Sequence, residues 1–372
     1  MDGMRTASST RPAADLDVTA GPVELTRRLV DIPSVSGDEQ AVADAVEAVL
    51  QAAAHLEVER IGNTLVARTR LGRDQRVAVA GHLDTVPVNG NLPARLEGGV
   101  LHGLGTCDMK GGVAVALHLA ATVAEPTRDV TWLFYDCEEV DAERNGLTRI
   151  GRTRPDLLAA DFAVLMEPSD ARVEAGCQGT IRVTVTTRGE RAHSARAWKG
   201  RNAVHAAADV LTRLQGYSPR QPVIDGLEYR EGLNAVRIEG GVAGNVIPDE
   251  CVVTVNHRFA PDRSEEEAVA FVEEFFAPYD VVVVDSAPGA LPGLSLPAAA
   301  DFVAAVGGDV APKYGWTDVA RFSILGVPAV NYGPGDPSWA HHRDEHVPVE
   351  QIERVAERMR TWLTSGNEEA QA

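Results

Sequence analysis

The sequence has 372 residues, of which 44% are hydrophobic and 24% are charged. This composition is typical of a folded protein, and the length predicts two domains. Its 54 acidic residues outnumber its 35 basic ones and give a net charge of −19, which argues against nucleic acid or an anionic membrane as a partner.

The first sixteen residues have no apolar run of the kind found in signal peptides, so we expect a flexible tail over residues 1–16. No later stretch is apolar for long enough to span a membrane. The cysteines are scattered, without a CxxC pair, which favours a reducing cytoplasm. They are Cys107, Cys137, Cys177 and Cys251.

The first half of the chain predicts alternating strands and helices. Ser36 and Glu39 have the spacing of a capping box, which predicts a helix running to about residue 54. Further along, short apolar runs predict strands that end at polar residues. The elements expected after the first helix are strands 56–60, 64–69 and 76–80, helix 110–124, and strands 130–135 and 161–165.

The pattern changes near Gly176, where half-exposed strands begin. The order strand, helix, strand, strand, helix, strand predicts a small ferredoxin-like α+β unit. Its expected elements are strand 181–187, helix 202–214, strands 233–239 and 251–259, and a helix opened by a capping box at Ser264 and Glu267. We therefore expect an α/β domain over 17–175 and 288–372, closed by a helix at 349–363 and interrupted by a domain over 176–287.

Five clusters along the chain offer imidazole and carboxylate groups, most of them just after a predicted strand. Open α/β sheets bind ligands at that edge, and zinc accepts both kinds of group. Any one cluster is more often a surface hydrogen bond or a solvated face, but all five in order indicate a metal centre. The clusters are Gly81–Pro87, Gly103–Gly112, Asp136–Glu139, Met166–Pro168 and Ala340–His346.

That order resembles the co-catalytic dinuclear zinc peptidases and deacylases, a family that includes acetylornithine deacetylase, succinyl-diaminopimelate desuccinylase, aminoacylase and glutamate carboxypeptidase. The resemblance runs from about Leu25 to the C-terminal helix. It implies a zinc-peptidase-like catalytic domain with a central sheet between helices, and an inserted dimerisation or lid domain. It also implies a cytoplasmic homodimer with two Zn²⁺, for which Co²⁺ can substitute.

Carried over residue by residue, the resemblance assigns a role to each polar cluster. Asp84 would orient the His82 imidazole, Asp108 would bridge the two metals, and Glu138 would be the general base for the attacking water. The metal ligands implied are His82, Asp108, Glu139, Glu167 and His341.

Two local choices accompany this assignment. His341 occupies the family's ligand position before Asp-Glu, although His342 and His346 have the i, i+4 spacing of a metal pair on a helix. Prolines on either side argue against a regular helix there, which favours His341. Cys107 and Cys137 adjoin ligands, but small buried side chains pointing away from the site are the expected role.

Substrate-binding residues are implied in the inserted domain and after it. His193, in Arg-Ala-His-Ser, matches a family histidine that stabilises the oxyanion, often across a dimer interface. Arg258 and Arg321 are candidates for binding substrate carboxylates, and Asn245 is expected to line the same cleft. Each could instead be an ordinary surface, turn or salt-bridge residue.

Within the family, the motifs are most similar to the desuccinylase branch. This implies hydrolysis of N-succinyl-L,L-2,6-diaminopimelate to succinate and L,L-diaminopimelate, a step of lysine biosynthesis. The alternative within the family is acetylornithine deacetylase or another N-acyl amino-acid hydrolase or carboxypeptidase. An alternative of another class is a non-catalytic metal-binding homologue. The presence of a suitable residue at every expected site position argues against this alternative.

Overall fold

The computed structural model describes residues 16–365, so the tail expected at the N-terminus lies, except for Leu16, outside the described residues. The chain forms two compact units. Among the described residues, the first comprises 16–173, Ala298–Asp309 and 330–365, and the second comprises Glu174–Pro297 and Val310–Ala329.

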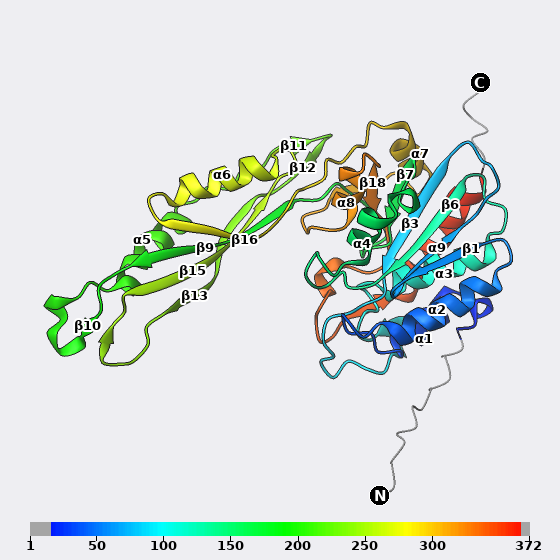
Figure 1. Ribbon diagram of the computed structural model, residues 1–372. Helices are drawn as coiled ribbons and strands as arrows, with labels where there is room; N and C mark the ends of the chain where they lie inside the picture. The colour runs from blue at the N-terminus through cyan, green and yellow to red at the C-terminus, as the bar shows by residue number, and fades with distance from the viewer. Residues whose placement is uncertain (1–15, 366–372) are drawn as a thin grey trace, which may run out of the picture. The chain divides into compact units, whose positions relative to one another are not determined.

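The first unit is built around a mixed sheet (Figure 1). Its strands lie in the order β1 (Glu57–Ile61), β2 (Thr64–Arg68), β6 (Asp129–Tyr135), β3 (Arg76–His82), β7 (Phe162–Leu165) and β18 (Ala329–Asn331). The central strand β3 runs parallel to both β6 and β7. These strands are buried along nearly their whole length, as expected for parallel strands covered on both faces.

Helices pack together beside this sheet. They are α1 (Pro22–Val30), α2 (Gln40–Ala52), α3 (Lys110–Thr122) and α9 (Val349–Thr364), and α3 also contacts β3 (Figure 1). Glycine allows the first turn of α3 to approach the sheet closely, because a Cβ on Gly112 would lie 2.0 Å from the backbone oxygen of Met166. The start of α3 is therefore held against the end of β7.

The first unit also contains a small antiparallel sheet, which adjoins two loops that carry predicted site residues. Its strands are β4 (Arg95–Glu97), β5 (Val100–His102) and β19 (His346–Pro348), with β5 in the middle. Leu101 and Val347 are paired across β5 and β19 and are fully buried. This sheet anchors the two loops that adjoin it, residues 103–109 and 340–345.

The second unit has the predicted ferredoxin-like fold. Its elements follow in the order β9 (Gly179–Arg188), α5 (Ala203–Gln215), β13 (Gly232–Gly240), β15 (Glu250–Phe259), α6 (Glu265–Phe276) and β16 (Asp280–Ala287). The sheet order is β13-β15-β9-β16, and both helices contact it. The predicted α/β class with an inserted α+β unit is confirmed.

One predicted capping box is confirmed and the other is wrong. At Ser264 the hydroxyl accepts from the backbone of Glu267, and the glutamate carboxylate accepts from the backbone of Ser264. Helix α2, by contrast, begins at Gln40 without a side-chain cap. The Ser36 hydroxyl instead donates to the buried carboxylate of Asp84 at 2.7 Å, a tertiary contact that local spacing does not reveal.

The remaining elements are short. They are η1 (Val18–Ala20), α4 (Gly146–Thr153), η2 (Pro155–Leu157), β8 (Val173–Ala175), β10 (Ala192–His193), η3 (Ser194–Lys199), β11 (Val223–Ile224), β12 (Leu227–Glu228), β14 (Val246–Ile247), α7 (Pro297–Ala305), β17 (Val310–Pro312), α8 (Val319–Ile324) and η4 (Pro337–Trp339). Within residues 16–365, no helix has the length and apolar character needed to cross a membrane.

Candidate active site

His82 is the last residue of β3 and lies at the centre of the predicted cluster. Its Nδ1 donates to the backbone oxygen of Asp84 at 3.0 Å, and its Nε2 lies 3.1 Å from Oδ1 of Asp108. Burial lowers the pKa of His82, but the two aspartates outweigh it and raise the pKa well above its usual value. A buried imidazole that faces a carboxylate in this way needs a proton or a cation between the two groups.

Asp84 connects the end of β3 to the turn after β6. Its carboxylate is fully buried and accepts hydrogen bonds from the backbone amides of Glu138, at 3.0 Å, and Glu139, at 3.1 Å. Burial raises the pKa of Asp84, but the contacts with His82, these amides and Ser36 lower it overall. Asp84 therefore sets the orientation of His82 and of both glutamates at once.

His341 joins the same cluster from the loop before β19. Its Nε2 lies 2.9 Å from Oε1 of Glu139 and 3.5 Å from Oδ2 of Asp108. The hydrogen bonds to Asp108 and then to Glu139 raise the pKa of His341 to about 10. Asp108 is thus faced by a histidine at each of its two oxygens, and these contacts lower the pKa of its carboxyl although burial opposes them.

These side chains fit a pair of divalent cations. One ligand atom from each of His82, Asp108 and Glu139 lies within 4.8 Å of the other two. Imidazole nitrogen and carboxylate oxygen are the ligands that Zn²⁺ takes in catalytic sites. A carboxylate with a different histidine at each oxygen also suits an aspartate that bridges two ions. His82, Asp108, Glu139 and His341 could therefore hold metal together.

Glu167 lies at the same edge of the sheet. It follows β7 by two residues, and β7 pairs with β3 so that Ala80 lies opposite Leu165. The residue is 5% exposed. The backbone oxygen of its neighbour Met166 lies against Gly112 in the first turn of α3, just after Asp108. This placement is compatible with the predicted ligand role.

Sequence reasoning missed the role of Glu345 as a support for the Asp108 loop. Its buried carboxylate accepts from the backbone amides of Gly105 (2.9 Å), Cys107 (2.9 Å) and Asp108 (3.0 Å). Burial raises its pKa to about 7, although the amides act in the opposite direction. The sequence signal for this role is the Asp-Glu pair that follows His341, because Glu345 is its second residue.

Two residues in this region have left-handed backbone conformations that are uncommon outside glycine. Cys137 precedes Glu138 with φ of 59°, and His341 has φ of 63°. Such conformations cost free energy and persist where the surrounding structure enforces them, often at functional sites. They direct the glutamates and His341 in a way that regular secondary structure would not.

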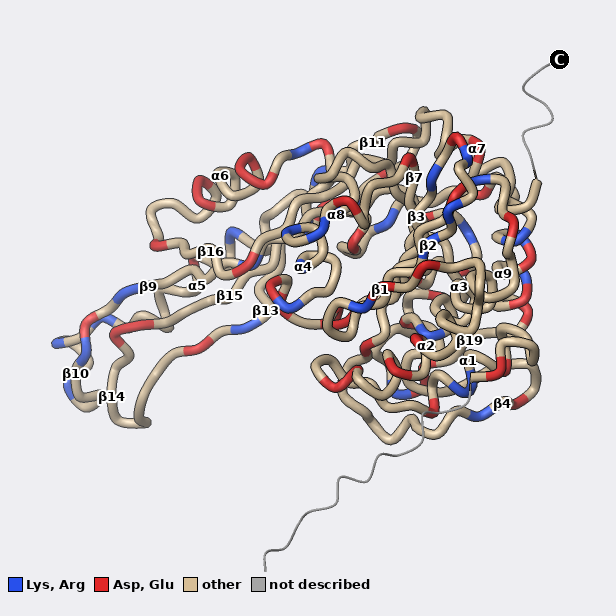
Figure 2. The backbone as a smooth tube through the Cα atoms, turned by 45° about the vertical axis from the view of Figure 1, so that its right-hand side comes forward, with Lys and Arg blue, Asp and Glu red and all other residues tan. Residues whose placement is uncertain are grey.

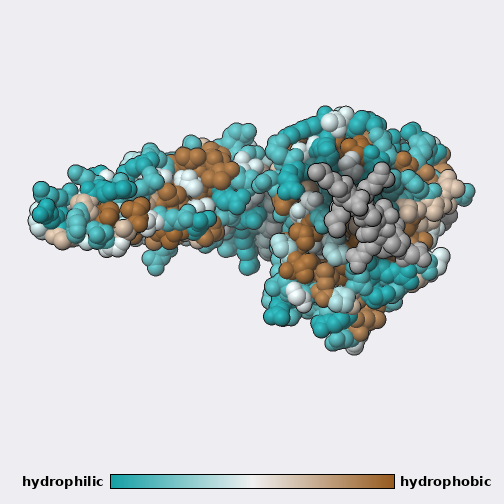
Figure 3. All heavy atoms as spheres, turned by 60° about the horizontal axis from the view of Figure 1, so that its bottom comes forward, coloured by the Kyte–Doolittle hydropathy of each residue, from teal (hydrophilic) through white to brown (hydrophobic). Residues whose placement is uncertain are grey.

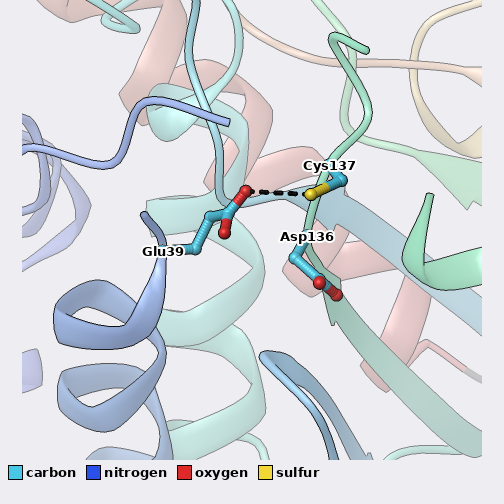
Figure 4. Close-up of side chains that lie close together, drawn as sticks. All are labelled: Glu39, Asp136 and Cys137. Carbon is cyan, nitrogen blue, oxygen red and sulfur yellow. Dashed lines mark hydrogen bonds between the residues drawn. The ribbon is translucent and has the colours of Figure 1, made fainter. Parts of the chain in front are cut away.

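A second acidic group lies nearby, where Glu39, Asp136 and Cys137 are close together (Figure 4). The Cys137 thiol donates to Glu39 at 3.3 Å, and Arg149 donates to Asp136 at 2.5 Å. Thr64 also donates to Asp136. Burial raises the pKa of Cys137 to about 12, so the thiol stays protonated near neutral pH. This group is held by internal hydrogen bonds.

In the second unit, His193 and Asn245 lie together. The antiparallel pair β10 and β14 brings them close, and Ser194 donates its backbone N–H to the backbone oxygen of Asn245 at 2.9 Å. The His193 ring is exposed, and its Nδ1 accepts from the backbone of Ala195 at 3.0 Å. In the neutral ring the hydrogen is therefore on Nε2, which can act as a donor.

The two candidate arginines of the second unit differ in their surroundings. Arg258 is on β15, where burial lowers its pKa, and no carboxylate among the described residues forms an ion pair with it. Arg321 is on α8, where it contacts the carboxylate of Asp318 and lies over the ring of Trp316 at 5.1 Å. Of the two, Arg258 is the one with its charge available.

Comparison with known proteins gives close relatives. The family model described as peptidase family M20/M25/M40 matches residues 78–365. A Mycobacterium tuberculosis protein provisionally named succinyl-diaminopimelate desuccinylase DapE is 58% identical over 94% of this chain and 99% of its own. The succinyl-diaminopimelate desuccinylase of Corynebacterium glutamicum is 48% identical over 94% and 98%.

A solved structure shows the same fold at lower identity. It is a Bacillus subtilis protein described as a dinuclear metal-binding peptidase of the M20 family, with a TM-score of 0.68 and 18% identity, covering 93% of this chain and 97% of that one. The family model covers well over half of the chain, and both relatives span nearly its whole length. The chain belongs to the peptidase family M20/M25/M40.

Proposed function

We propose that this protein hydrolyses the amide bond of N-succinyl-L,L-2,6-diaminopimelate and releases succinate and L,L-diaminopimelate. The observation that carries the reaction type is the cluster in which Asp108 faces the buried His82 on one oxygen and His341 on the other. The substrate follows from the relatives at 58% and 48% identity, whose names specify that desuccinylation.

The metal centre in this proposal consists of two zinc ions, for which cobalt can substitute. His82, Asp108, Glu139, Glu167 and His341 would hold them, with Asp108 between the two. The bound pair supplies a water of lowered pKa and polarises the scissile carbonyl. Asp84 keeps His82 in the tautomer that leaves Nε2 free, because Nδ1–H is directed at the backbone oxygen of Asp84.

Glu138 has the proton-transfer role. Its backbone amide donates to Asp84. The next residue is Glu139, whose carboxylate is one of the proposed metal ligands. In the forward reaction, Glu138 takes a proton from the attacking water and gives it to the nitrogen that leaves as the amine. The carbon–nitrogen bond breaks and the former carbonyl carbon becomes a carboxylate of succinate. Glu138 has passed the proton to the amine and is again a carboxylate.

Arg258 is the proposed contact for a substrate carboxylate. The substrate has three carboxylates, and guanidinium binds such groups through two parallel hydrogen bonds. The absence of an ion-pair partner for Arg258 among the described residues supports this role. Arg321 already contacts Asp318, so its proposed contact with substrate, like that of Asn245, would be secondary.

His193 would stabilise the oxyanion, and we propose that it does so in a neighbouring subunit. Arg258 pairs with Thr180 in the sheet, whereas the strand pair β10 and β14, which carries His193, adjoins the other end, where Glu250 pairs with Arg188. Eight residues of strand separate these positions, which is about 26 Å at about 3.3 Å per residue. One substrate molecule could not contact both residues of the same unit.

Exposed features of the second unit suit such a homodimer. The end that carries β10 and β14 is rich in Lys and Arg (Figure 2), although the chain as a whole has a net charge of −19. Hydrophobic residues also appear on the surface of this unit (Figure 3). On the edge strands β13 and β16, Val236 is 60% exposed and Val284 is 57% exposed.

We also propose a cytoplasmic location. All four cysteines are buried and none of them is in a disulfide, which suits a reducing compartment.

The experiment that tests the proposed function is a comparison of substrates on one zinc-loaded preparation. We expect kcat/KM for N-succinyl-L,L-diaminopimelate to exceed that for N-acetylornithine by at least about 100-fold, because the substrate's additional carboxylates contribute binding energy in the transition state. Equal or reversed values would identify another N-acyl amino-acid hydrolase. No hydrolysis of either compound with both metals bound would favour the non-catalytic homologue.

A further inference from the structure

Two histidines outside the candidate active site form a cross-strand pair on the small sheet of the first unit. His102 on β5 and His346 on β19 are direct partners in the antiparallel register. Side chains at paired positions lie on the same face of a sheet. The two rings are 5.3 Å apart between centroids and inclined by 37°.

This separation is suitable for two imidazoles that bind one metal ion. A ligating nitrogen lies about 2.1 Å from zinc and the ring centre about 1 Å beyond it, so tetrahedral geometry places two ring centres about 5 Å apart. Ordinary ring packing also occurs at this distance. The hydrogen bonds of the rings must therefore decide between the two interpretations.

The hydrogen bonds favour metal binding. Nδ1 of His346 lies 2.8 Å from the backbone oxygen of Asp344 and must be the donor, because a carbonyl oxygen only accepts. The lone pair of Nε2 is then available, in the arrangement usual for histidines that bind metals. No hydrogen bond engages the His102 ring within the described part of the chain, so this ring also has a nitrogen available.

The surroundings leave room for further ligands. His102 lines a cavity of about 480 Å³ together with Asp344, Glu345, Arg95 and Arg343. Water in this cavity can complete the coordination of an ion held by two imidazoles. Arg95 and Arg343 offset the charges of Asp344 and Glu345 in this lining, so binding depends on the imidazoles, which suit zinc, nickel and copper better than Mg²⁺.

We propose that His102 and His346 form an accessory site for a first-row transition-metal dication, separate from the dinuclear centre. The order of affinity is Cu²⁺ above Ni²⁺ and Zn²⁺, with Mg²⁺ and Mn²⁺ excluded. An ion in this site joins β5 to β19. The loop of residues 103–109 follows β5, and Glu345, which binds the amides of Gly105, Cys107 and Asp108, directly precedes β19. Occupancy therefore braces the loop that carries Asp108.

Trp339 gives a spectroscopic signal for this site. Its ring centroid is 4.5 Å from that of His346. Cu²⁺ or Ni²⁺ bound at His346 quenches the fluorescence of an indole at that distance. The test is therefore a titration of the zinc-loaded full-length protein with Ni²⁺, with fluorescence and bound nickel measured together and zinc retention checked by elemental analysis.

The expected result is one nickel ion bound in addition to the two zinc ions, with quenching that disappears in the Trp339→Phe variant. His102→Phe keeps an aromatic ring against His346 but removes a ligand, and it should reduce the nickel affinity by at least about tenfold, as loss of a ligand-shell group does elsewhere. His346→Asn should do the same. The matched control is His205→Ala, which removes an exposed histidine of α5 and should leave the titration unchanged.

Two outcomes would overturn the proposal. One is saturation at two metals with no third ion in the wild-type protein. The other is a third ion whose affinity is equal in the wild type, His102→Phe and His346→Asn, which would locate it elsewhere. If His102→Phe fails to fold, His346→Asn gives the same comparison, and quenching by Ni²⁺ but not Mg²⁺ in the wild type tests the selectivity.

Discussion

His341 and Glu139 are 202 positions apart in the sequence, yet Nε2 of the histidine lies 2.9 Å from Oε1 of the glutamate. The contact joins the loop before β19 to the turn after β6. Together with Asp108, it raises the pKa of His341 to about 10. The metal-free protein therefore carries a proton on His341 at neutral pH, at the position where a metal is expected to bind.

Metal binding should release this proton. Zinc requires the neutral imidazole, so the affinity for the second ion should rise with pH up to about 10, the pKa of His341. Calorimetric titration at pH 8 in buffers of different ionisation enthalpy counts the protons released. His341→Ala should release about one proton fewer and bind one metal weakly. Unchanged proton release in His341→Ala would contradict the assignment.

The same shift predicts how stability of the metal-free protein depends on pH. The folded-state pKa of His341 lies above the unfolded value, so the contact stabilises the fold fully below about pH 6.5, and this contribution is lost as the pH rises through about 10. Thermal unfolding of metal-free protein between pH 7 and 10.5 measures the loss. The loss should be smaller in His341→Asn, which cannot be protonated.

Glu138→Gln should remove activity and leave the metal in place. The carboxamide cannot accept a proton, and loss of a general base costs about 10²–10⁴-fold in rate. We expect the upper end, because the same group protonates the leaving amine. The measurements are kcat and metal content of the same preparation.

Glu139→Gln is the matched comparison for Glu138→Gln. It alters one of the proposed metal ligands and should lower metal occupancy as well as activity. A Glu138→Gln enzyme with both metals bound and more than about a tenth of the wild-type kcat would be incompatible with the proposed mechanism.

Asp84→Asn should weaken both the site and the fold. The Asp84 carboxylate accepts from Ser36 and from the amides of Glu138 and Glu139, and an amide group cannot accept through its nitrogen. At least one buried donor loses its partner, which typically costs about 1–3 kcal/mol. The substitution also removes the negative charge that lies 3.5 Å from Nδ1 of His82, which should reduce metal affinity or activity by about 10–100-fold. Metal titration and thermal unfolding measure the two effects.

The control for Asp84→Asn is Ser36→Ala, which removes one of the hydrogen bonds and leaves the carboxylate. It should lower the midpoint of thermal unfolding less than Asp84→Asn does. Equal effects of the two substitutions on metal affinity would show that the carboxylate of Asp84 does not orient the site.

His257 should make the second unit sensitive to acid. The residue is 1% exposed, donates from Nδ1 to the backbone of Gly232 at 3.0 Å, and has a pKa lowered by burial. Its folded-state pKa lies below the unfolded value, so this contribution to stability is complete above about pH 6.5 and is lost as the pH falls below it. Hydrogen exchange of β15 at pH 7.5 and pH 5 should show the loss of protection.

His257→Phe should make that protection less dependent on pH. Phenylalanine suits the neighbouring rings of Phe259 and Phe271, whose centroids lie 5.8 and 5.3 Å from that of His257. The lost hydrogen bond should lower stability at pH 7.5 by about 1 kcal/mol. An unchanged slope between pH 7.5 and pH 5 would exclude His257 as the sensor.

The sequence by itself determined the elements and the kinds of ligand they carry. His82, Glu138 and Glu167 follow apolar runs, and parallel strands bring their ends to one edge of a sheet. The ferredoxin-like order of the second unit and the capping box at Ser264 were also predictable. These features depend on periodicity and on residues a few positions apart, which a sequence displays directly.

Only the tertiary structure decided which groups support the site. The partner of Ser36 is Asp84, and the carboxylate of Glu345 binds three amides of the Asp108 loop. Arg258 and the β10–β14 pair that carries His193 are at opposite ends of the paired strands β9 and β15. Each of these relationships joins segments that are distant in the sequence or depends on sheet register. Local spacing contains no information about such pairs, because they form only when the packed sheets bring the segments together.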